Sequence, residues 1–387
     1  MTPPNRGFPV SEYQDRLDRA QTLMNAADLG ALLLTTEPEI RYFTGFLTRF
    51  WESPTRPWYL VVPATGKPVA VVPSIGAHLM SQTWITDIRT WASPHYSDDG
   101  IGLLADTLAE LAGKTGNIGA PSGPETHLRM PIADWARLNE LVGADRLVPD
   151  ADITRRLRMV KSPAEISKIR VACGVADRAF ARVAEIAQTG EPLDRVFRRF
   201  QALCLDEGAD WVSYLAGAAD QQGYDDVISP ATNKALRGGD VLMLDTGVVW
   251  DGYFCDFDRN FSVGPATPAV ANAHARLIDA TRAAYDHARP GRTAAELFHK
   301  MDAVLTGGTS GAEPGRLGHG LGMQLSEWPS IIPQDQTVLE EGMVLTLEPG
   351  ITLAGDKIMV HEENIVITET GADFLSSPAK REIVVLE

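Results

Sequence analysis

The sequence predicts a two-domain α/β protein, with an N-terminal α/β domain over residues 1–155 and a strand-rich α+β domain over residues 156–387. Three observations favour this fold class. A chain of 387 residues is too long for one ordinary hydrophobic core. Helical and strand patterns alternate up to about Asp150, whereas strands dominate after Trp211. The composition, 44% hydrophobic and 22% charged, is typical of a soluble globular protein.

In the N-terminal domain, apolar residues recur with the helical period in some segments and form short buried runs in others. Glycines end the helical segments, as helix C-caps commonly do. The predicted helices span residues 11–30, 100–116 and 131–143. The predicted strands span residues 31–36, 58–63 and 69–73. These segments make a modest α/β layer.

The second domain is predicted to begin with a long helix. Ser162 suits the N-cap, Pro163 suits the first turn, and Glu165 completes a capping box. Its helical pattern continues through residues 166–188. The further helices predicted in this domain span residues 193–208, 268–288 and 294–305.

Charge and cysteine content exclude several classes of function. The net charge of −16 and the pI of about 5.0 disfavour nucleic-acid binding, because an acidic surface repels phosphates. Three cysteines without a CxxC pair disfavour a disulfide framework and a thiolate zinc site. No signal peptide and no membrane-spanning run is evident, so the cytoplasm is the expected location and no membrane partner is expected.

Three aspartates are predicted to share one face of a β-ribbon. Asp251-Gly252 is a strong turn signal between two apolar runs. Side chains alternate along strands, so Asp245, Asp256 and Asp258 project to the same side of the ribbon. This holds for either of two strand registers, in which the numbers of two opposite residues add up to 501 or to 503. Three adjacent carboxylates repel one another unless a cation or protons lie between them. The ribbon therefore predicts a metal site.

Two later strands carry further candidate ligands. Glu348 lies in the apolar run VLTLEPG, and His361, Glu362 and Glu363 lie in IMVHEENIVIT. Alternation alone does not decide whether Glu362 or Glu363 faces inward. One of these two glutamates is expected to be a solvated charge at a strand edge.

These acids and His319, in GHGLG, resemble an established ligand pattern. The order Asp245, Asp256, His319, Glu348, Glu362 is similar to that of the M24 metallopeptidase family, over residues 160–387. The preceding residues are similar to the creatinase-type N-terminal domain. The resemblance implies a creatinase-like N-terminal α/β domain before a pita-bread catalytic domain, an α+β fold with a curved antiparallel sheet. The creatinase and Xaa-Pro peptidase branch, with prolidase and aminopeptidase P, fits best.

The resemblance also implies roles for the five ligands. Asp256 and Glu362 would bridge two divalent metal ions, Asp245 would chelate one ion, and His319 and Glu348 would hold the other. Glu348 would also carry a proton during attack by metal-activated water. Oxygen-rich ligation with one imidazole suits Mn, Fe, Co or Zn. A homodimer is expected from the same resemblance.

The sequence departs from the peptidase pattern at two positions. Ser326 stands where the family usually has a second histidine, although Glu327 keeps the rest of the motif. Residues 223–240 contain no histidine, where the family usually has another. The candidate catalytic residues are therefore Glu348, Asp258, Ser326 and Glu327, although a nucleophilic role for Ser326 is not expected.

Other polar and aromatic residues are candidate substrate contacts. Tyr224, Asp225 and Asp226 occupy the segment without histidine, and their acidic groups would suit a cationic or zwitterionic small molecule. Equally, Asp225 and Asp226 could be turn residues, and Asp258 could pair with an arginine. Trp328 follows Glu327, and Trp51 lies in the aromatic segment of residues 49–58; core packing is the alternative for each tryptophan.

The predicted function is a dinuclear metal-dependent hydrolase that cleaves a C–N bond in an amide or peptide. The missing histidines favour a small non-peptide or zwitterionic substrate over an ordinary Xaa-Pro peptide. The alternatives are a metal-dependent lyase similar to dimethylsulfoniopropionate lyases, and an enzyme similar to ectoine hydrolases. A binding protein without catalytic activity is disfavoured because all five ligands are present.

Overall fold

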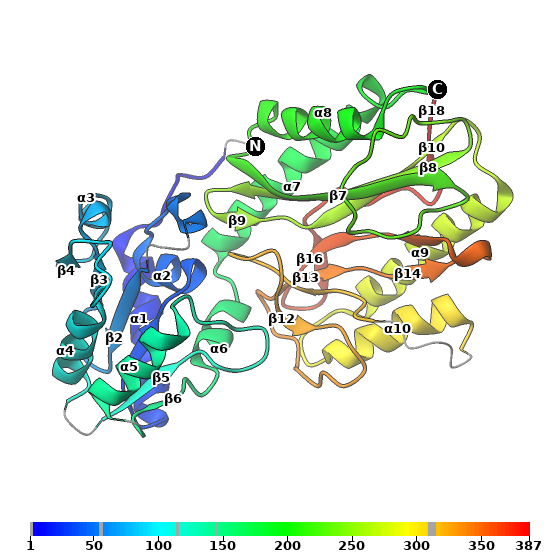
Figure 1. The fold of residues 1–387 in the computed structure, drawn as a ribbon. Helices are drawn as coiled ribbons and strands as arrows, with labels where there is room; N and C mark the ends of the chain where they lie inside the picture. The colour runs from blue at the N-terminus through cyan, green and yellow to red at the C-terminus, as the bar shows by residue number, and fades with distance from the viewer. Residues whose placement is uncertain (1–2, 54–56, 114–115, 144, 309–314) are drawn as a thin grey trace. The chain divides into compact units, whose positions relative to one another are not determined.

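The computed structural model describes residues 3–53, 57–113, 116–143, 145–308 and 315–387 (Figure 1). The chain forms two compact units. The N-terminal unit spans Asn5–Arg158, and the C-terminal unit spans Met159–Glu387 together with Pro3 and Pro4. The five ligands predicted from the sequence all lie in the C-terminal unit, so this unit is described in more detail.

The N-terminal unit is built on one mixed sheet with the strand order β4-β3-β2-β1-β5-β6. Its strands are β1 Leu29–Leu34, β2 Tyr59–Pro63, β3 Val69–Pro73, β4 Asp87–Trp91, β5 Asn117–Ala120 and β6 Leu147–Pro149. Its α-helices are α1 Val10–Ala26, α2 Glu37–Thr44, α3 Ala77–Met80, α4 Ile101–Leu111, α5 Ile132–Val142 and α6 Ile153–Met159. Two 3₁₀-helices are η1 Phe50–Glu52 and η2 Ser74–Gly76. Helices α4 and α5 contribute to the apolar core that covers the sheet.

The C-terminal unit contains two larger sheets and a hairpin. The first sheet has the order β18-β10-β8-β7 with β9 beside β8, and the second has the order β12-β11-β13-β16-β17. The first sheet contains β7 Trp211–Gln221, β8 Asp240–Trp250, β9 Tyr253–Phe254, β10 Phe257–Val263 and β18 Val384–Leu386. The second contains β11 His319–Gly320, β12 Glu327–Ser330, β13 Val344–Leu347, β16 Glu363–Ile367 and β17 Ala372–Phe374. The hairpin is β14 Gly350–Thr352 and β15 Ile358–Val360.

Four long helices cover these sheets (Figure 1). They are α7 Pro163–Ala181, α8 Leu193–Asp206, α9 Pro268–His287 and α10 Ala294–Thr306, with 3₁₀-helices η3 Val183–Glu185 and η4 Ala354–Asp356. Helix α7 packs on β8, and α8 packs on β7. Helix α9 contacts β13, β14 and β15, and α10 packs against α9. Together the two sheets and their helices match the predicted pita-bread architecture.

The predicted capping box starts helix α7. The Ser162 hydroxyl accepts a hydrogen bond from the Glu165 backbone N–H at 3.3 Å, and the Glu165 carboxylate accepts one from the Ser162 N–H at 2.9 Å. The helix is shorter than predicted, because it ends at Ala181 and η3 follows.

The predicted turn at Asp251-Gly252 joins β8 to β9 and β10. Both turn residues have positive φ values, 50° and 77°, as a type I′ turn requires. In the resulting register Asp258 lies directly opposite Asp245, a pairing whose positions sum to 503. Two candidate acids thus lie side by side on neighbouring strands.

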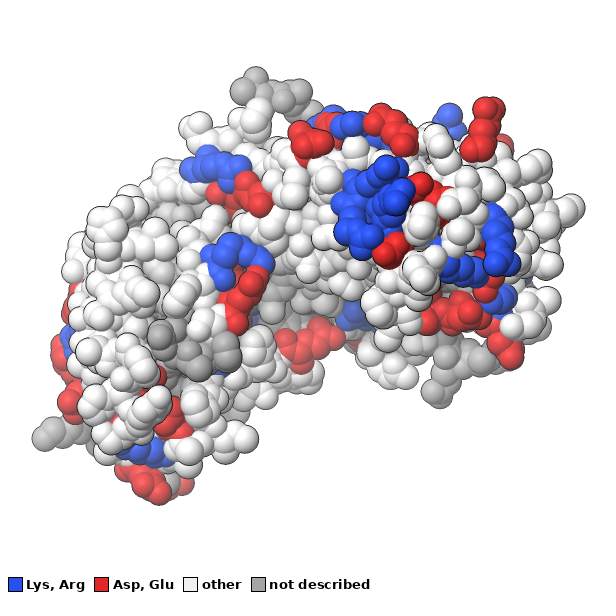
Figure 2. All heavy atoms as spheres, turned by 45° about the horizontal axis from the view of Figure 1, so that its top comes forward, with Lys and Arg blue, Asp and Glu red and all other residues white. Residues whose placement is uncertain are grey.

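On the face drawn in Figure 2, acidic side chains lie next to basic ones, so this face has no large continuous acidic patch among the described residues. Among the described residues, no helix is long and apolar enough to cross a membrane.

Candidate metal centre

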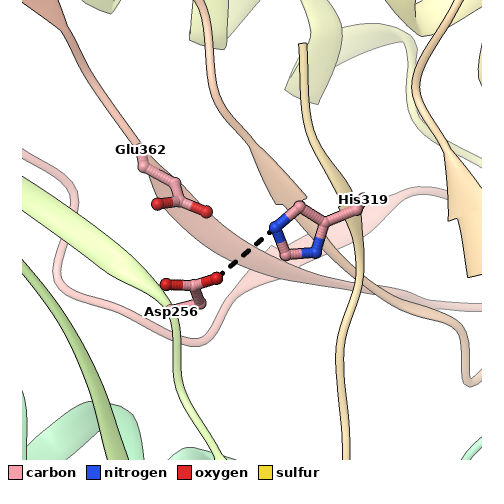
Figure 3. A group of neighbouring side chains, drawn as sticks. All are labelled: Asp256, His319 and Glu362. Carbon is pink, nitrogen blue, oxygen red and sulfur yellow. Dashed lines mark ion pairs between the residues drawn. The ribbon is translucent and has the colours of Figure 1, made fainter. Parts of the chain in front are cut away.

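Three side chains from different strands converge in the C-terminal unit (Figure 3). Asp256 precedes β10, His319 begins β11, and Glu362 precedes β16. All three are buried, and one ligand atom of each lies within 4.8 Å of the others. The His319 Nε2 atom is 3.4 Å from Asp256 Oδ2. Both sheets therefore contribute to one candidate metal centre.

Hydrogen bonds orient the His319 ring. Its backbone N–H donates to Thr346 Oγ1 at 3.2 Å, and its Nδ1 lies 2.8 Å from the Gly320 carbonyl oxygen. A carbonyl can only accept, so Nδ1 carries a proton and Nε2 is the ring nitrogen that remains available to a metal ion. Nε2 faces the Asp256 carboxylate, as the ligand atom of a metal site would.

The glycines beside His319 allow neighbouring strands to approach closely. Gly318 has a φ of +133°, and a Cβ atom there would lie 2.3 Å from the Thr346 carbonyl oxygen. A Cβ atom at Gly320 would lie 1.9 Å from the Trp328 carbonyl oxygen. The sequence GHG is therefore needed to fit β11 between β12 and β13 with the imidazole directed into the site.

Asn364 holds the backbone of Asp256. Its Oδ1 accepts from the Asp256 N–H at 3.0 Å, and its Nδ2 donates to the Asp256 carbonyl oxygen. Asn364 lies in β16, two residues after the ligand Glu362. This contact connects the ligands from the two sheets.

Without bound cations, the carboxylates of the candidate ligands resist ionisation. Burial, together with the charges of neighbouring acids, raises the pKa of Asp245 and of Glu362 well above the usual range. Burial also raises the pKa of Asp256, against the opposing effect of His319. Burial raises the pKa of Glu348 to about 7, and the charge of His319 opposes that shift. A set of acids with these pKa values is stabilised by bound cations.

Unsatisfied buried atoms support the same interpretation. Asp245 Oδ1 and Glu362 Oε1 have no hydrogen-bond partner among the residues that the structure describes. Buried carboxylate oxygens without a donor are costly in a protein interior. The donor set of four carboxylates and one imidazole therefore fits divalent cations.

Asp258 belongs to a buried chain of charged groups beside the ligands. Its Oδ1 lies 3.5 Å from His361 Nδ1, and His361 Nε2 lies 3.3 Å from Glu363 Oε1. Glu363 Oε2 in turn accepts from Arg259 Nη2 at 3.0 Å. Arg259 therefore pairs with Glu363 and reaches Asp258 only at its backbone carbonyl oxygen, to which Nη1 donates at 2.6 Å, so the alternative of an ion pair between Arg259 and the Asp258 carboxylate is not what the structure shows.

The expectation that either Glu362 or Glu363 is a solvated edge charge is wrong. Both are buried, with exposed fractions of 2% and 1%. Although burial favours the neutral acid, Arg259 and His361 lower the pKa of Glu363 to about 2. An internal cation thus replaces water as the partner of Glu363.

Ser326 lies beside a cation. Arg316 Nη1 donates to Ser326 Oγ at 2.9 Å. Arg316 and Glu348 both line a pocket of about 450 Å³, which is also lined by Arg276 and Asp302. This pocket brings a candidate metal ligand and a guanidinium to one cavity.

Glu327 is occupied within the protein. Its Oε1 accepts from the backbone N–H groups of Met323 and Gln324 at 2.9 and 3.1 Å, and its Oε2 lies 3.1 Å from Lys161 Nζ. These contacts favour a role in positioning the segment that carries Ser326. The neighbouring Trp328 is 5% exposed and belongs to the hydrophobic core.

The segment of residues 224–226 makes structural contacts. Tyr224 is fully buried; its hydroxyl donates to Asn260 Oδ1 at 3.2 Å and accepts from the Val360 N–H at 2.7 Å. Asp225 is exposed and lies 2.7 Å from Lys357 Nζ. Asp226 accepts from the Ile228 and Ser229 N–H groups, as a turn residue does. These contacts favour the turn interpretation of Asp226, whereas Asp225 forms an ion pair with Lys357.

Trp51 packs inside the N-terminal unit. It is 8% exposed, and its ring centroid lies 6.4 Å from that of Phe46 and 5.8 Å from that of Trp58. The Arg129 guanidinium lies 5.2 Å from the Trp51 ring centroid. Residues 54–56 of the predicted aromatic segment lie outside the described residues. A substrate contact by Trp51 stays a prediction.

Three residues near the ligands were not selected from the sequence: Tyr214, Arg316 and Asn364. Burial and then the charges of Asp245 and Asp256 raise the pKa of Tyr214, which places this β7 side chain beside the metal centre. Arg316 precedes His319 by three residues, and this short separation is the only feature of the sequence that places Arg316 near the candidate ligands. Tyr214 and Asn364 depend on sheet pairing, so nothing local marked them.

Two family models match the chain. Metallopeptidase family M24 matches residues 167–369, and the Creatinase/Prolidase N-terminal domain matches residues 16–160. The first match covers the five candidate ligands. The two matches together account for both units.

Similar proteins are peptidases by name. The chain is 30% identical to a probable dipeptidase PepE of Mycobacterium tuberculosis over 95% of both chains. It is 31% identical to a Xaa-Pro dipeptidase of Pyrococcus furiosus over 60% of this chain and 67% of that protein. Among solved structures, dipeptidase PepE from Mycobacterium ulcerans matches with a TM-score of 0.85 and 29% identity, covering 99% of this chain and all of that one. A Thermococcus sibiricus prolidase shares the fold, with a TM-score of 0.86 and 23% identity.

Proposed function

Since the chain belongs to metallopeptidase family M24 and is a metallohydrolase, we propose that it hydrolyses the C–N bond of a dipeptide or a similarly small zwitterionic amide, with two divalent cations bound. One observation carries this proposal: the buried side chains of Asp256, His319 and Glu362 converge from two sheets, and Glu362 Oε1 and Asp245 Oδ1 have no hydrogen-bond partner among the described residues. The relatives named as dipeptidases support the substrate size.

Each ligand would have a distinct place in the cation site. Asp256 and Glu362 would supply carboxylates from buried positions, Asp245 would supply a third, and His319 would supply Nε2. Divalent cations in such a site polarise a carbonyl group and lower the pKa of bound water. Mn, Fe, Co and Zn all suit this donor set.

Glu348 is the residue best placed to hold and move a proton. It is the only ligand of the five that also lines the 450 Å³ pocket among the described residues. Because this residue is both a candidate ligand and part of the pocket wall, its carboxylate is placed to accept a proton from water and to donate it to a leaving amine. We therefore assign the general-base and general-acid role to the Glu348 carboxylate.

The pocket suits a small zwitterion. Its volume of about 450 Å³ lies in the ordinary range for small-molecule sites. Cationic and anionic side chains, Arg316 and Asp302, both line it, and the wall includes Leu317, Ile351 and Met359. Opposite charges within one cavity can neutralise a carboxylate and an ammonium group of the same ligand.

The test combines metal content with product analysis. We expect about two divalent ions per chain after loading with Mn, and release of free amino acids from alanyl-proline, followed by mass spectrometry. His319→Ala should lose at least one ion and reduce kcat by 100-fold or more, on the order expected for a lost ligand. Folded protein that binds no divalent ion would overturn the proposal, and an elimination product from a small zwitterion would assign the site to a lyase.

A further inference from the structure

A second cavity lies in the C-terminal unit, apart from the cavity that Glu348 lines. Its volume is about 470 Å³, which is within the ordinary range for small-molecule sites. Its wall is formed by residues of α7, β10 and α9 and by residues from the segment 377–384. Among the described residues, none lines both cavities, so the proposed function makes no use of this second one.

His274 of α9 provides an unused hydrogen-bond acceptor in the wall of this cavity. Its side chain is 2% exposed, and its Nε2 lies 3.0 Å from the Lys380 carbonyl oxygen, to which a protonated Nε2 donates. Burial, together with the charge of His361, lowers the pKa of His274 to about 4, so at pH 7 the ring is neutral and Nδ1 keeps a lone pair. Nδ1 has no hydrogen-bond partner among the described residues. A ligand with an N–H group would supply the missing donor.

Asp177 of α7 adds a partly buried carboxylate to the same wall. Burial raises the pKa of Asp177, and hydrogen bonds from Ser377 oppose that shift. The nearest cation is Arg259, whose Nη2 is 4.0 Å from Asp177 Oδ1. Lys380 and Glu382 also line the cavity, and their opposite charges balance each other. A bound cation would therefore stabilise the ionised form of Asp177.

The cavity does not suit an anion, although Arg259 lines it. Arg259 Nη1 donates to the carbonyl oxygens of Asp258 and Glu362. Its Nη2 donates to the Glu363 carboxylate and to the Ser377 carbonyl oxygen. The four N–H donors of the two terminal nitrogens are thus all used within the protein. A carboxylate or phosphate ligand would have to displace one of these contacts.

We propose that this cavity binds a small organic ammonium ion with an apolar tail. The ammonium group would donate to the Asp177 carboxylate and to His274 Nδ1, and the tail would pack against Phe180, Phe261 and Val384. An ammonium ion carries several N–H donors and a charge, whereas an alcohol supplies one donor and no charge. The inference stands apart from the proposed function, because none of the five candidate metal ligands lines the cavity.

Calorimetry on the Mn-loaded full chain tests the chemistry of the ligand. It compares phenethylammonium with two probes of similar shape, 2-phenylethanol and 3-phenylpropanoate. We expect phenethylammonium to bind with a dissociation constant of about 1 mM or lower, and the alcohol and the carboxylate to bind at least about 10-fold more weakly. Asp177→Asn and His274→Phe should each weaken binding of the ammonium ion about 5- to 20-fold. Equal affinities of the wild type for the three probes would overturn the proposal.

A variant that fills the cavity leaves both acceptors in place. Ala181 is the exposed last residue of α7 and lines the cavity, so Ala181→Trp should abolish binding of phenethylammonium and keep the melting temperature of the wild type. Ala136→Trp is the matched control, because Ala136 is an exposed alanine of α5 in the N-terminal unit, and it should bind like the wild type.

Two results would place the ion elsewhere and overturn the proposal. One is binding of phenethylammonium that survives in Ala181→Trp. The other is a rise in KM for alanyl-proline when phenethylammonium is added, since competition would assign the ion to the substrate pocket. Failure of the wild type to bind Mn or to cleave alanyl-proline would instead count against the proposed function, because the binding measurements need neither metal nor turnover.

Discussion

Asp258 and His361 place a carboxylate and an imidazole directly beside the metal ligands. Asp258 lies opposite Asp245 in the β8–β10 ladder, and both of its oxygens lack a hydrogen bond that satisfies ordinary geometry among the described residues. The nearest polar partner is His361 Nδ1 at 3.5 Å. The charge of Asp258 contributes to the raised pKa values of Asp245 and Glu348. Asp258 thus adds negative potential where cations would bind.

The change Asp258→Asn should therefore weaken metal binding. Removing one negative charge while keeping the side-chain shape is expected to lower affinity for Mn about 10-fold, the lower end for residues that support metal ligands. Titration against a chelator measures the affinity. Asp279→Asn is a matched control, because Asp279 is an exposed acid that pairs with Arg381. Equal affinities of Asp258→Asn and the wild type would refute this role.

Among the structural elements, the short strand β11 has the strictest packing requirement. It contributes only His319 and Gly320, and it pairs with both β12 and β13. Gly318 lies just before β11, and a Cβ atom there would lie 2.3 Å from the Thr346 carbonyl oxygen, which leaves no room for a side chain. The position of His319 thus depends on backbone contacts more than on its own side chain.

Gly318→Ala should displace β11 from β13. A Cβ atom 2.3 Å from a carbonyl oxygen must move the strand, and the positive φ adds strain. We expect a loss of roughly 2 kcal/mol or more in unfolding free energy, together with weaker metal binding. Chemical denaturation and metal titration measure the two effects. Gly307→Ala is a suitable comparison, because that glycine also has positive φ but has nothing within 4 Å of its Cβ position; equal metal binding by both variants would contradict the prediction.

At the level of the whole molecule, the metal-free protein should lose stability as the pH rises. Glu348 has a folded pKa of about 7, raised by burial, against an ordinary value of 4.5. A raised folded pKa stabilises the fold below the unfolded pKa, and this stabilisation is lost as the pH rises toward 7. Asp245 and Glu362, whose pKa values are also raised, act in the same direction.

Thermal melts from pH 4.5 to 7.5 test this dependence. After removal of metal by a chelator, we expect the melting temperature to fall across this range, corresponding to about 1–3 kcal/mol. Saturating Mn should abolish the fall, because cations stabilise the ionised acids. A metal-free melting temperature that rises steadily over this range would contradict the assignment of these carboxylates. The homodimer and the cytoplasmic location stay predictions.

Much of the local structure could be predicted from the sequence, because it depends on near neighbours. The capping box at Ser162, the turn at Asp251-Gly252 and the start of α9 at Pro268 all follow from contacts within a few residues. The length of α7 could not be predicted, because its apolar pattern continues past Ala181 into a 3₁₀-helix.

The candidate ligands were identified from their order and local motifs, but their surroundings depend on tertiary structure. The alternation of side chains along the strand could not distinguish Glu362 from Glu363, and only the ion pairs of Glu363 with Arg259 and His361 explain how this second glutamate is also buried. Ser326 marked a departure from the peptidase pattern, yet its partner Arg316 appears only when the chain folds back on itself. Alternation and turn signals act over a few residues, whereas the partner of a buried charge is decided by strands far apart in the chain.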